Sequence, residues 1–145
     1  MTVKPVGNDS SNGTAGQITG ISNQIVSVNS LVSSADSSGT YAYTNAGLEQ
    51  VIFTIVTTTR KIIEGIWLDL VNMTHDGTIK IYYKIDGTNY REIDSIPYNI
   101  LTDSPGAYIS INMGITNDFR VTYTEGADEG VARNISYSII YRTVE

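Results

Sequence analysis

The chain has 145 residues, no cysteine and a net charge of -6, the size of one domain that buries roughly two thirds of its unfolded surface. The absence of cysteine excludes disulfide bridges, thiolate metal centres and a cysteine nucleophile. Nine Lys and Arg residues against fifteen Asp and Glu argue against a nucleic-acid partner, because affinity for phosphate backbones comes mainly from cations. We expect no signal peptide and no membrane partner, because no apolar run follows the N-terminus and none reaches membrane-spanning length.

Residues 1–40 differ from the rest of the chain in composition. They contain nine Ser and five Gly but no aromatic residue, and all thirteen aromatic residues follow them. Such a segment cannot bury enough apolar surface to fold alone. We therefore expect an extended N-terminal arm over residues 1–40, with one possible strand at 24–32, and a folded domain over residues 41–145.

Two interpretations of this arm remain open. It is either a disordered tail or a segment that becomes ordered along a neighbouring subunit, as in strand addition. The second interpretation assigns contacts to the scattered aliphatic side chains of Ile18, Ile21, Ile25, Val28 and Leu31.

From residue 47 onward the pattern is typical of β-strands. QVIFTIVTTT is rich in β-branched residues, and KIIEGIWLDL follows it. In TIKIYYKI, alternation places Tyr83 with three isoleucines, Ile79, Ile81 and Ile85, on a face that we assign to the core. Asp-Gly pairs at residues 76–77 and 86–87 bracket this strand and predict tight hairpins, and so a three-stranded meander over about residues 62–95.

Three further segments complete the predicted strand set. They are AYISINM, DFRVTYT and VARNISYSIIYR, which turn signals separate. With residues 24–32 the count reaches about eight strands, and no segment shows the pattern of an amphipathic helix. These features predict an all-β fold, an antiparallel β-sandwich of jelly-roll type with an extended N-terminal arm.

Candidates for catalysis or metal binding are sparse. His75 is the only histidine and directly precedes an Asp-Gly turn. The sequence contains no recognisable nucleophile motif, so we expect no catalytic triad. A single histidine also cannot form a multi-histidine metal site. The loop EGADEG groups Glu125, Asp128 and Glu129; it is either a solvated turn or a structural calcium site. We expect a non-enzymatic protein without catalytic residues, metal or cofactor.

Exposed aromatic residues are the better candidates for a binding surface. If Ile66, Leu68 and Leu70 point inward, Trp67 points outward, and alternation places Ile63 on the same face. An apolar patch of this kind favours a protein contact, and a sugar-stacking platform is the alternative. Tyr82, opposite the core face of its strand, and Tyr90, able to pair across the Asp86-Gly87 turn, complete the candidate interface.

The chain resembles small β-sandwich structural proteins of tailed-phage virions, particularly head decoration or accessory proteins. The residues that carry this resemblance run from EGIWLDLVNMTHDGTIKIYYKIDGTNYREID to the closing ARNISYSIIYR, and the Gly/Ser/Asn-rich arm precedes them. The resemblance implies a module without catalytic residues that binds a capsid lattice and is often a trimer. It also implies a location in the virion, after synthesis in the host cytoplasm.

Two functions from different classes follow from these observations. The first is a structural protein of a virion or similar lattice, a homo-oligomer that acts through its arm and an exposed aromatic strand face. The second is a carbohydrate-binding β-sandwich module with Trp67, Tyr82 and Tyr90 as stacking residues.

Overall fold

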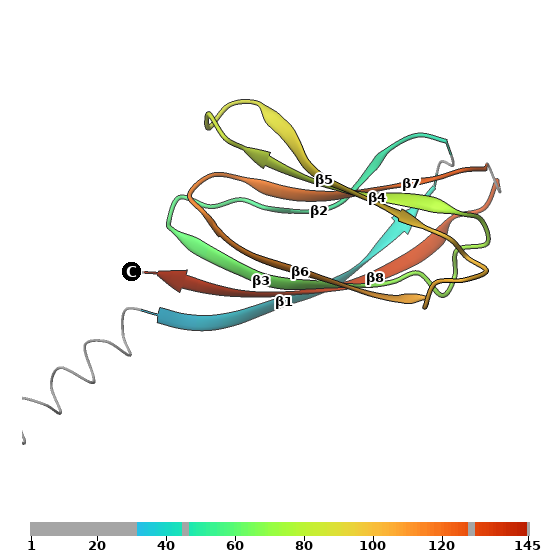
Figure 1. Cartoon of the computed structure of the whole chain (residues 1–145), viewed down its shortest axis with the longest axis horizontal. Coiled ribbons are helices and arrows are strands. Elements are labelled where there is room, and N and C mark those ends of the chain that lie inside the picture. Colours follow the sequence, from blue (N-terminus) through green and yellow to red (C-terminus); the bar gives the residue numbers. More distant parts are fainter. Residues whose placement is uncertain (1–31, 45–46, 128–129, 145) are drawn as a thin grey trace, which may run out of the picture.

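The computed structural model describes residues 32–44, 47–127 and 130–144. Two four-stranded antiparallel sheets face each other (Figure 1). Sheet A has the strand order β1-β8-β3-β6, and sheet B has the order β2-β7-β4-β5. The strands are β1 (Val32–Tyr43), β2 (Gln50–Ile55), β3 (Lys61–Asp69), β4 (Gly77–Lys84), β5 (Tyr90–Tyr98), β6 (Gly106–Ile115), β7 (Phe119–Glu125) and β8 (Arg133–Val144).

The connections define a jelly roll. Only β4 and β5 are consecutive strands within one sheet, and every other connection crosses from one sheet to the other. Two four-stranded sheets wound together in this way form the jelly-roll arrangement. The predicted fold class is therefore confirmed. Within the described ranges, no helix is long and apolar enough to cross a membrane.

One predicted supersecondary unit is wrong. The Asp86-Gly87 turn does join β4 to β5, with Gly87 at φ 74°, but β3 does not pair with β4. Instead β3 is an inner strand of sheet A, paired with β6 and β8. The segment between β3 and β4 carries the chain to the other sheet, so the three-stranded meander does not form.

The core lies between the two sheets and contains most of the residues that alternation assigned to it. Ile66, Leu68 and Leu70 of the first segment are fully buried. In β4, Ile79 and Ile81 are also buried. Tyr83 is half-buried against the core, whereas Ile85, which was expected inside, is 64% exposed because it lies in the turn after the strand.

The first strand occupies part of the segment that was assigned to the arm. β1 spans residues 32–43 and pairs with β8 over its whole length, from Val32 opposite Val144 to Tyr43 opposite Arg133. The boundary drawn at residue 40 therefore falls inside a strand of sheet A. Apart from Val32, the strand expected at 24–32 lies outside the described residues.

The β4–β5 turn is closed by the carboxylate of Asp86. Its Oδ1 accepts hydrogen bonds from the backbone N–H groups of Thr88 at 2.9 Å and Asn89 at 2.7 Å. Its Oδ2 accepts a third from the side chain of Asn89 at 3.1 Å. The Asn89 and Thr88 backbone bonds lower the pKa of Asp86 to about 2, because each stabilises the ionised form.

The lowered pKa of Asp86 predicts that the stability of the fold decreases in acid. A carboxylate whose pKa falls from its ordinary value of 3.8 to about 2 on folding stabilises the fold above the unfolded pKa, and this contribution is lost as the pH falls from about 4 to about 2. We expect Asp86→Asn to lower the thermal midpoint at pH 6, with the difference from the parent chain shrinking below pH 4. A difference that stays constant from pH 6 to pH 2 would contradict this role.

Candidate interaction surface on sheet A

An exposed aromatic pair lies on the outer face of sheet A. Trp67 in β3 stands directly opposite Tyr108 in β6, and their ring centroids are 4.6 Å apart at an interplanar angle of 41°. Trp67 is 47% exposed and Tyr108 is 50% exposed. Two large rings held half in solvent are characteristic of residues that bind a partner, because aromatic anchors contribute most to interface energies.

A glycine allows the pair to form. Gly65 lies two residues before Trp67, and a Cβ at this position would overlap the Tyr108 ring. The ring of Tyr108 therefore lies over Gly65 of β3 and against Trp67. The two aromatic residues come from segments about forty residues apart in sequence, so only the pairing of β3 with β6 brings them together.

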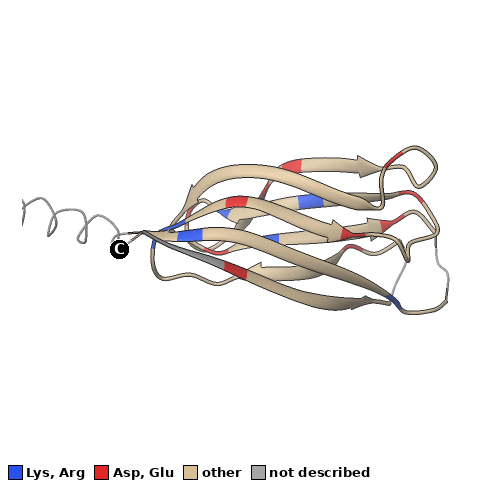
Figure 2. Cartoon of the chain, turned by 90° about the horizontal axis from the view of Figure 1, so that it is seen from below, with Lys and Arg blue, Asp and Glu red and all other residues tan. Residues whose placement is uncertain are grey.

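The surface around the pair is rich in hydroxyl groups and poor in charge. A shallow hollow of about 240 Å³ beside Trp67 is lined by Asp69, Gly106, Ser136 and Ser138. β6 contains no charged residue, and Asp69 is the charged residue that lines the hollow. Figure 2, which views the molecule from the side of sheet A, shows the charged positions as separate bands along the strands. A face without many charges can be covered by a partner at a low desolvation cost.

Ile63 does not belong to this surface, and this part of the prediction is wrong. Its side chain is fully buried. The register of β3 with both neighbouring strands shifts between Ile63 and Gly65, and relative to β8, Glu64 is an extra residue in a β-bulge. Because a bulge reverses the alternation of faces, Ile63 points into the core although it is four residues from Trp67.

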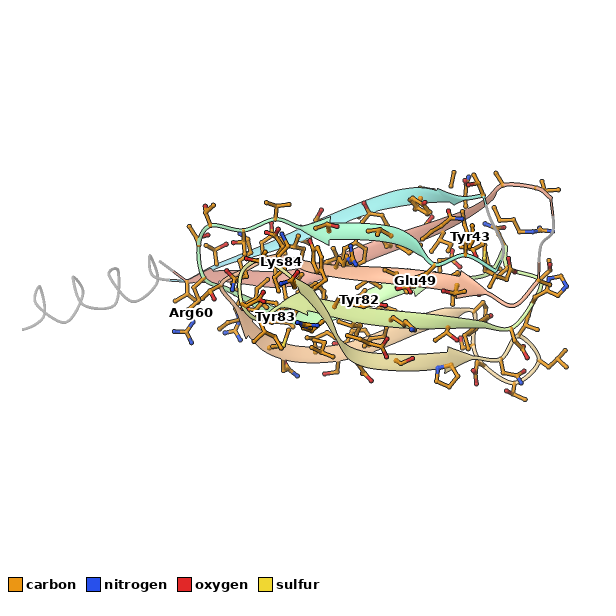
Figure 3. All side chains as sticks on the ribbon, turned by 90° about the horizontal axis from the view of Figure 1, so that it is seen from above. Tyr43, Glu49, Arg60, Tyr82, Tyr83 and Lys84 are labelled. Carbon is orange, nitrogen blue, oxygen red and sulfur yellow. The ribbon has the colours of Figure 1, made fainter. Side chains whose placement is uncertain are left out.

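Tyr82 and Tyr90 lie on the other face of the sandwich, on sheet B. Figure 3 views this side and labels Tyr82 with Glu49 and Lys84. The Arg120 guanidinium carbon lies 5.0 Å from the ring centroid of Tyr82 and 3.9 Å from that of Tyr90. Tyr90 pairs with Lys84 across the hairpin, as predicted.

Lys84, which lies beside Tyr90, is bound to an acidic residue of the same chain. Lys84 Nζ is 4.9 Å from the Tyr90 ring centroid and forms a salt bridge of 2.8 Å with Asp118. The hydrogen bond from Lys84 to Asp118 raises the pKa of Lys84. Burial, and then the hydrogen bond with Glu49, raise the pKa of Tyr82. Tyr82 and Tyr90 thus stack on cations of the same molecule, unlike the solvent-facing pair on sheet A.

The acidic loop after β7 has a structural role at its first residue. Glu125 is 2% exposed, and its Oε1 accepts hydrogen bonds from the backbone N–H groups of Thr74 at 3.3 Å and His75 at 3.2 Å. It therefore ties the segment before β4 to β7. Asp128 and Glu129 lie outside the described residues, and within the described ranges no three His, Cys, Asp or Glu side chains form a group that could hold a metal ion.

The remaining predicted contacts cannot be placed. Ile18, Ile21, Ile25, Val28 and Leu31 lie outside the described residues. The sequence-based prediction also missed Tyr108, which stands in the AYISINM strand without any local sign that it joins Trp67. The alternation of that strand places Tyr108 and Ile109 on opposite faces, but only the strand order shows which residue Tyr108 contacts.

Three solved structures match the chain at 16% identity or less and with TM-scores below 0.5. No protein-family model matches the chain, and no curated protein matches its sequence. A subunit of the disulfide-linked pili that form Bacillus endospore appendages has 11% identity and a TM-score of 0.47, and the match covers 78% of this chain and 89% of that one. The present chain has no cysteine and cannot form such links.

Two other similar structures come from different sources. The Yersinia pseudotuberculosis-derived mitogen has 15% identity and a TM-score of 0.45, over 78% of this chain and 86% of that one. The infectious bursal disease virus VP2 subviral particle has 16% identity and a TM-score of 0.42, over 79% of this chain but 32% of that one. The neighbours thus include pilus and viral capsid β-sandwiches, and the narrower resemblance to tailed-phage proteins stays a prediction.

Proposed function

We propose that the chain is a non-enzymatic structural subunit of a virion or a similar protein lattice, with capsid decoration as the specific role. The observation that carries this proposal is the exposed pair of Trp67 and Tyr108 on the outer face of sheet A, where Asp69 is the charged residue that lines the adjoining hollow. In this role the pair packs against another subunit, either a second copy of the chain or the lattice it decorates.

The aromatic pair is too small to form a complete interface by itself. A specific interface buries about 800 Å² on each partner, and two half-exposed rings supply only a fraction of that area. The neighbouring surface with Ser136 and Ser138 therefore has to be covered too. Hydroxyl groups at its rim would then form hydrogen bonds with the partner, as polar rims of interfaces commonly do.

The N-terminal segment supplies a second contact in this proposal. Residues 1–31 directly precede β1 in the sequence, and β1 is an edge strand of the sheet that carries the aromatic pair. Their low charge, from Lys4 and Asp9 alone, and their scattered aliphatic residues support contact with a neighbour, in line with strand addition. A homo-oligomer, with a trimer as one arrangement, follows from the same proposal.

The solution mass of the full chain tests this function. Light scattering over a range of concentrations should show a defined oligomer or a filament whose population grows with concentration. Trp67 is the only tryptophan, so its fluorescence emission should shift to shorter wavelength as the outer face of sheet A becomes covered. A monomer at every concentration, with unchanged emission, would contradict the homo-oligomer in this proposal.

A carbohydrate-binding module is the second candidate function, and one observation favours it. The hollow beside Trp67 combines an aromatic ring with the carboxylate of Asp69 and two serine hydroxyls, the kinds of group that stack on and hydrogen-bond a sugar. This function predicts that a soluble polysaccharide shifts Trp67 emission and is retained by the parent chain but not by Trp67→Ala. Retention that is equal for both chains would exclude Trp67 as the sugar platform.

A further inference from the structure

Each sheet of the sandwich has two edge strands whose outer N–H and C=O groups can pair with another strand. Edge strands of natural proteins usually carry features that prevent such pairing, including short length, bulges, charged residues and proline. The four edges here are β1 and β6 in sheet A, and β2 and β5 in sheet B. An edge that lacks these features is a candidate for contact with another chain.

Three of the four edges carry such features. β2 has only six residues, and its register with β7 shifts between Val51 and Phe53. β5 contains Arg91, Glu92, Asp94 and Pro97, and its register with β4 is also shifted. β6 is interrupted by Asn112, which has a φ of 48° where its register with β3 shifts.

β1 is the exception. It has twelve residues, VSSADSSGTYAY, without lysine, arginine or proline, and Asp36 is its only charged residue. Its register with β8 runs without a shift from Val32 to Tyr43. Within the described part of the chain, β8 is the only strand that forms a ladder with β1. β1 is therefore a long edge without a bulge and with a single charged residue.

We propose that β1 pairs antiparallel with β1 of a second copy, so that sheet A continues across a two-fold axis into an eight-stranded sheet. This inference rests on the proposed assembly function and adds to it a contact at the edge of sheet A, separate from the one at Trp67 and Tyr108. The two edges are identical and mutually complementary, as an isologous interface requires.

The pattern of side chains on β1 fits this pairing. A two-fold axis perpendicular to the sheet places residues of the same face opposite each other. On β1 the outer face carries Asp36, Ser38 and Thr40, next to Ser138 and Ser136 of β8. In the register centred on Ser38, each Asp36 stands opposite Thr40 of the second copy. Like charges directly opposite each other, which destabilise a sheet, are thereby avoided.

Cysteine cross-linking of the full chain tests the pairing directly. The chain contains no cysteine, so a single substitution gives an unambiguous readout. Opposed residues of an antiparallel pair have Cα atoms about 4.5 to 5.5 Å apart, within the range that a disulfide spans. Under mild oxidation, Ser38→Cys should give a disulfide-linked dimer on a non-reducing gel.

A matched control lies on the opposite edge of the same sheet. Ser110 in β6 is exposed, stands opposite Gly65 and accepts a hydrogen bond from Asn112. Because pairing raises the effective concentration of the two thiols, we expect Ser38→Cys to cross-link roughly tenfold or more faster than Ser110→Cys at the same protein concentration. Asp36→Cys and Thr40→Cys should cross-link more slowly than Ser38→Cys.

The outcomes separate this inference from the proposed function. If light scattering shows an oligomer but none of the three β1 variants cross-links faster than Ser110→Cys, assembly uses another surface and the β1 pairing is wrong. If the chain is monomeric and no β1 variant cross-links, the proposed homo-oligomer and the β1 pairing are both wrong. A dimer trapped by Ser38→Cys whose mass matches the dimer of the parent chain would support the pairing.

Discussion

Replacing Trp67 with serine should weaken self-association of the chain by roughly 30-fold. Truncating a central aromatic anchor at an interface costs about 2 kcal/mol or more, and each 1.4 kcal/mol corresponds to about a tenfold change in the dissociation constant. The ring is 47% exposed in the single chain, so its loss should affect folding far less than assembly. Sedimentation velocity over a concentration series would give the dissociation constants.

The companion and control variants sharpen this result. Tyr108→Ser should weaken association in the same direction, because Tyr108 holds the Trp67 ring from one side. Leu101→Ser removes a side chain that is 90% exposed but lies in the loop between β5 and β6, away from the aromatic pair, and should leave association unchanged. Equal weakening by Trp67→Ser and Leu101→Ser would mean that general surface hydrophobicity drives the association.

The second large effect is expected at Gly77. A Cβ on this residue would overlap the ring of Tyr123, which is fully buried and packs edge-to-face on Tyr43 with ring centroids 5.4 Å apart. A ring enclosed in this way cannot move aside without disturbing the core. Overpacking of a core costs about 1 to 3 kcal/mol, and we expect Gly77→Ala to lie near the upper end, at about 3 kcal/mol of lost unfolding free energy.

Urea unfolding of the parent chain and two glycine variants would check this value. Gly106→Ala is the matched control, because a Cβ there meets only the Ser104 side chain at 4.0 Å, and it should change the unfolding free energy by less than about 0.5 kcal/mol. A loss below about 1 kcal/mol for Gly77→Ala would show that Tyr123 repacks freely.

Local patterns in the sequence predicted much of the fold. Alternation identified the buried face of the segment with Ile66, Leu68 and Leu70, and it placed Trp67 outside. The Asp86-Gly87 signal predicted the β4–β5 hairpin, because a tight turn there requires a positive φ, and Gly87 has one. These predictions hold because side-chain alternation and turn conformation depend on residues that are near each other in the chain.

The serine-rich strand β1 was beyond local prediction. SSADSSG has little intrinsic preference for a strand, and the composition of residues 1–40 indicated an arm. In the structure this stretch is extended because β8 supplies hydrogen-bond partners along its full length. Backbone pairing with a distant segment thus decided a conformation that the side chains of β1 do not specify.

By itself the sequence determined the all-β class, most strand positions, the exposed position of Trp67 and the lack of cysteine chemistry. Only the tertiary structure decided that β3 pairs with β6, which brings Tyr108 to Trp67, and that the bulge at Glu64 turns Ile63 into the core. The physical reason is the range of the interactions. Face and turn preferences act between near neighbours, whereas strand order and register depend on hydrogen bonds between segments far apart in the chain.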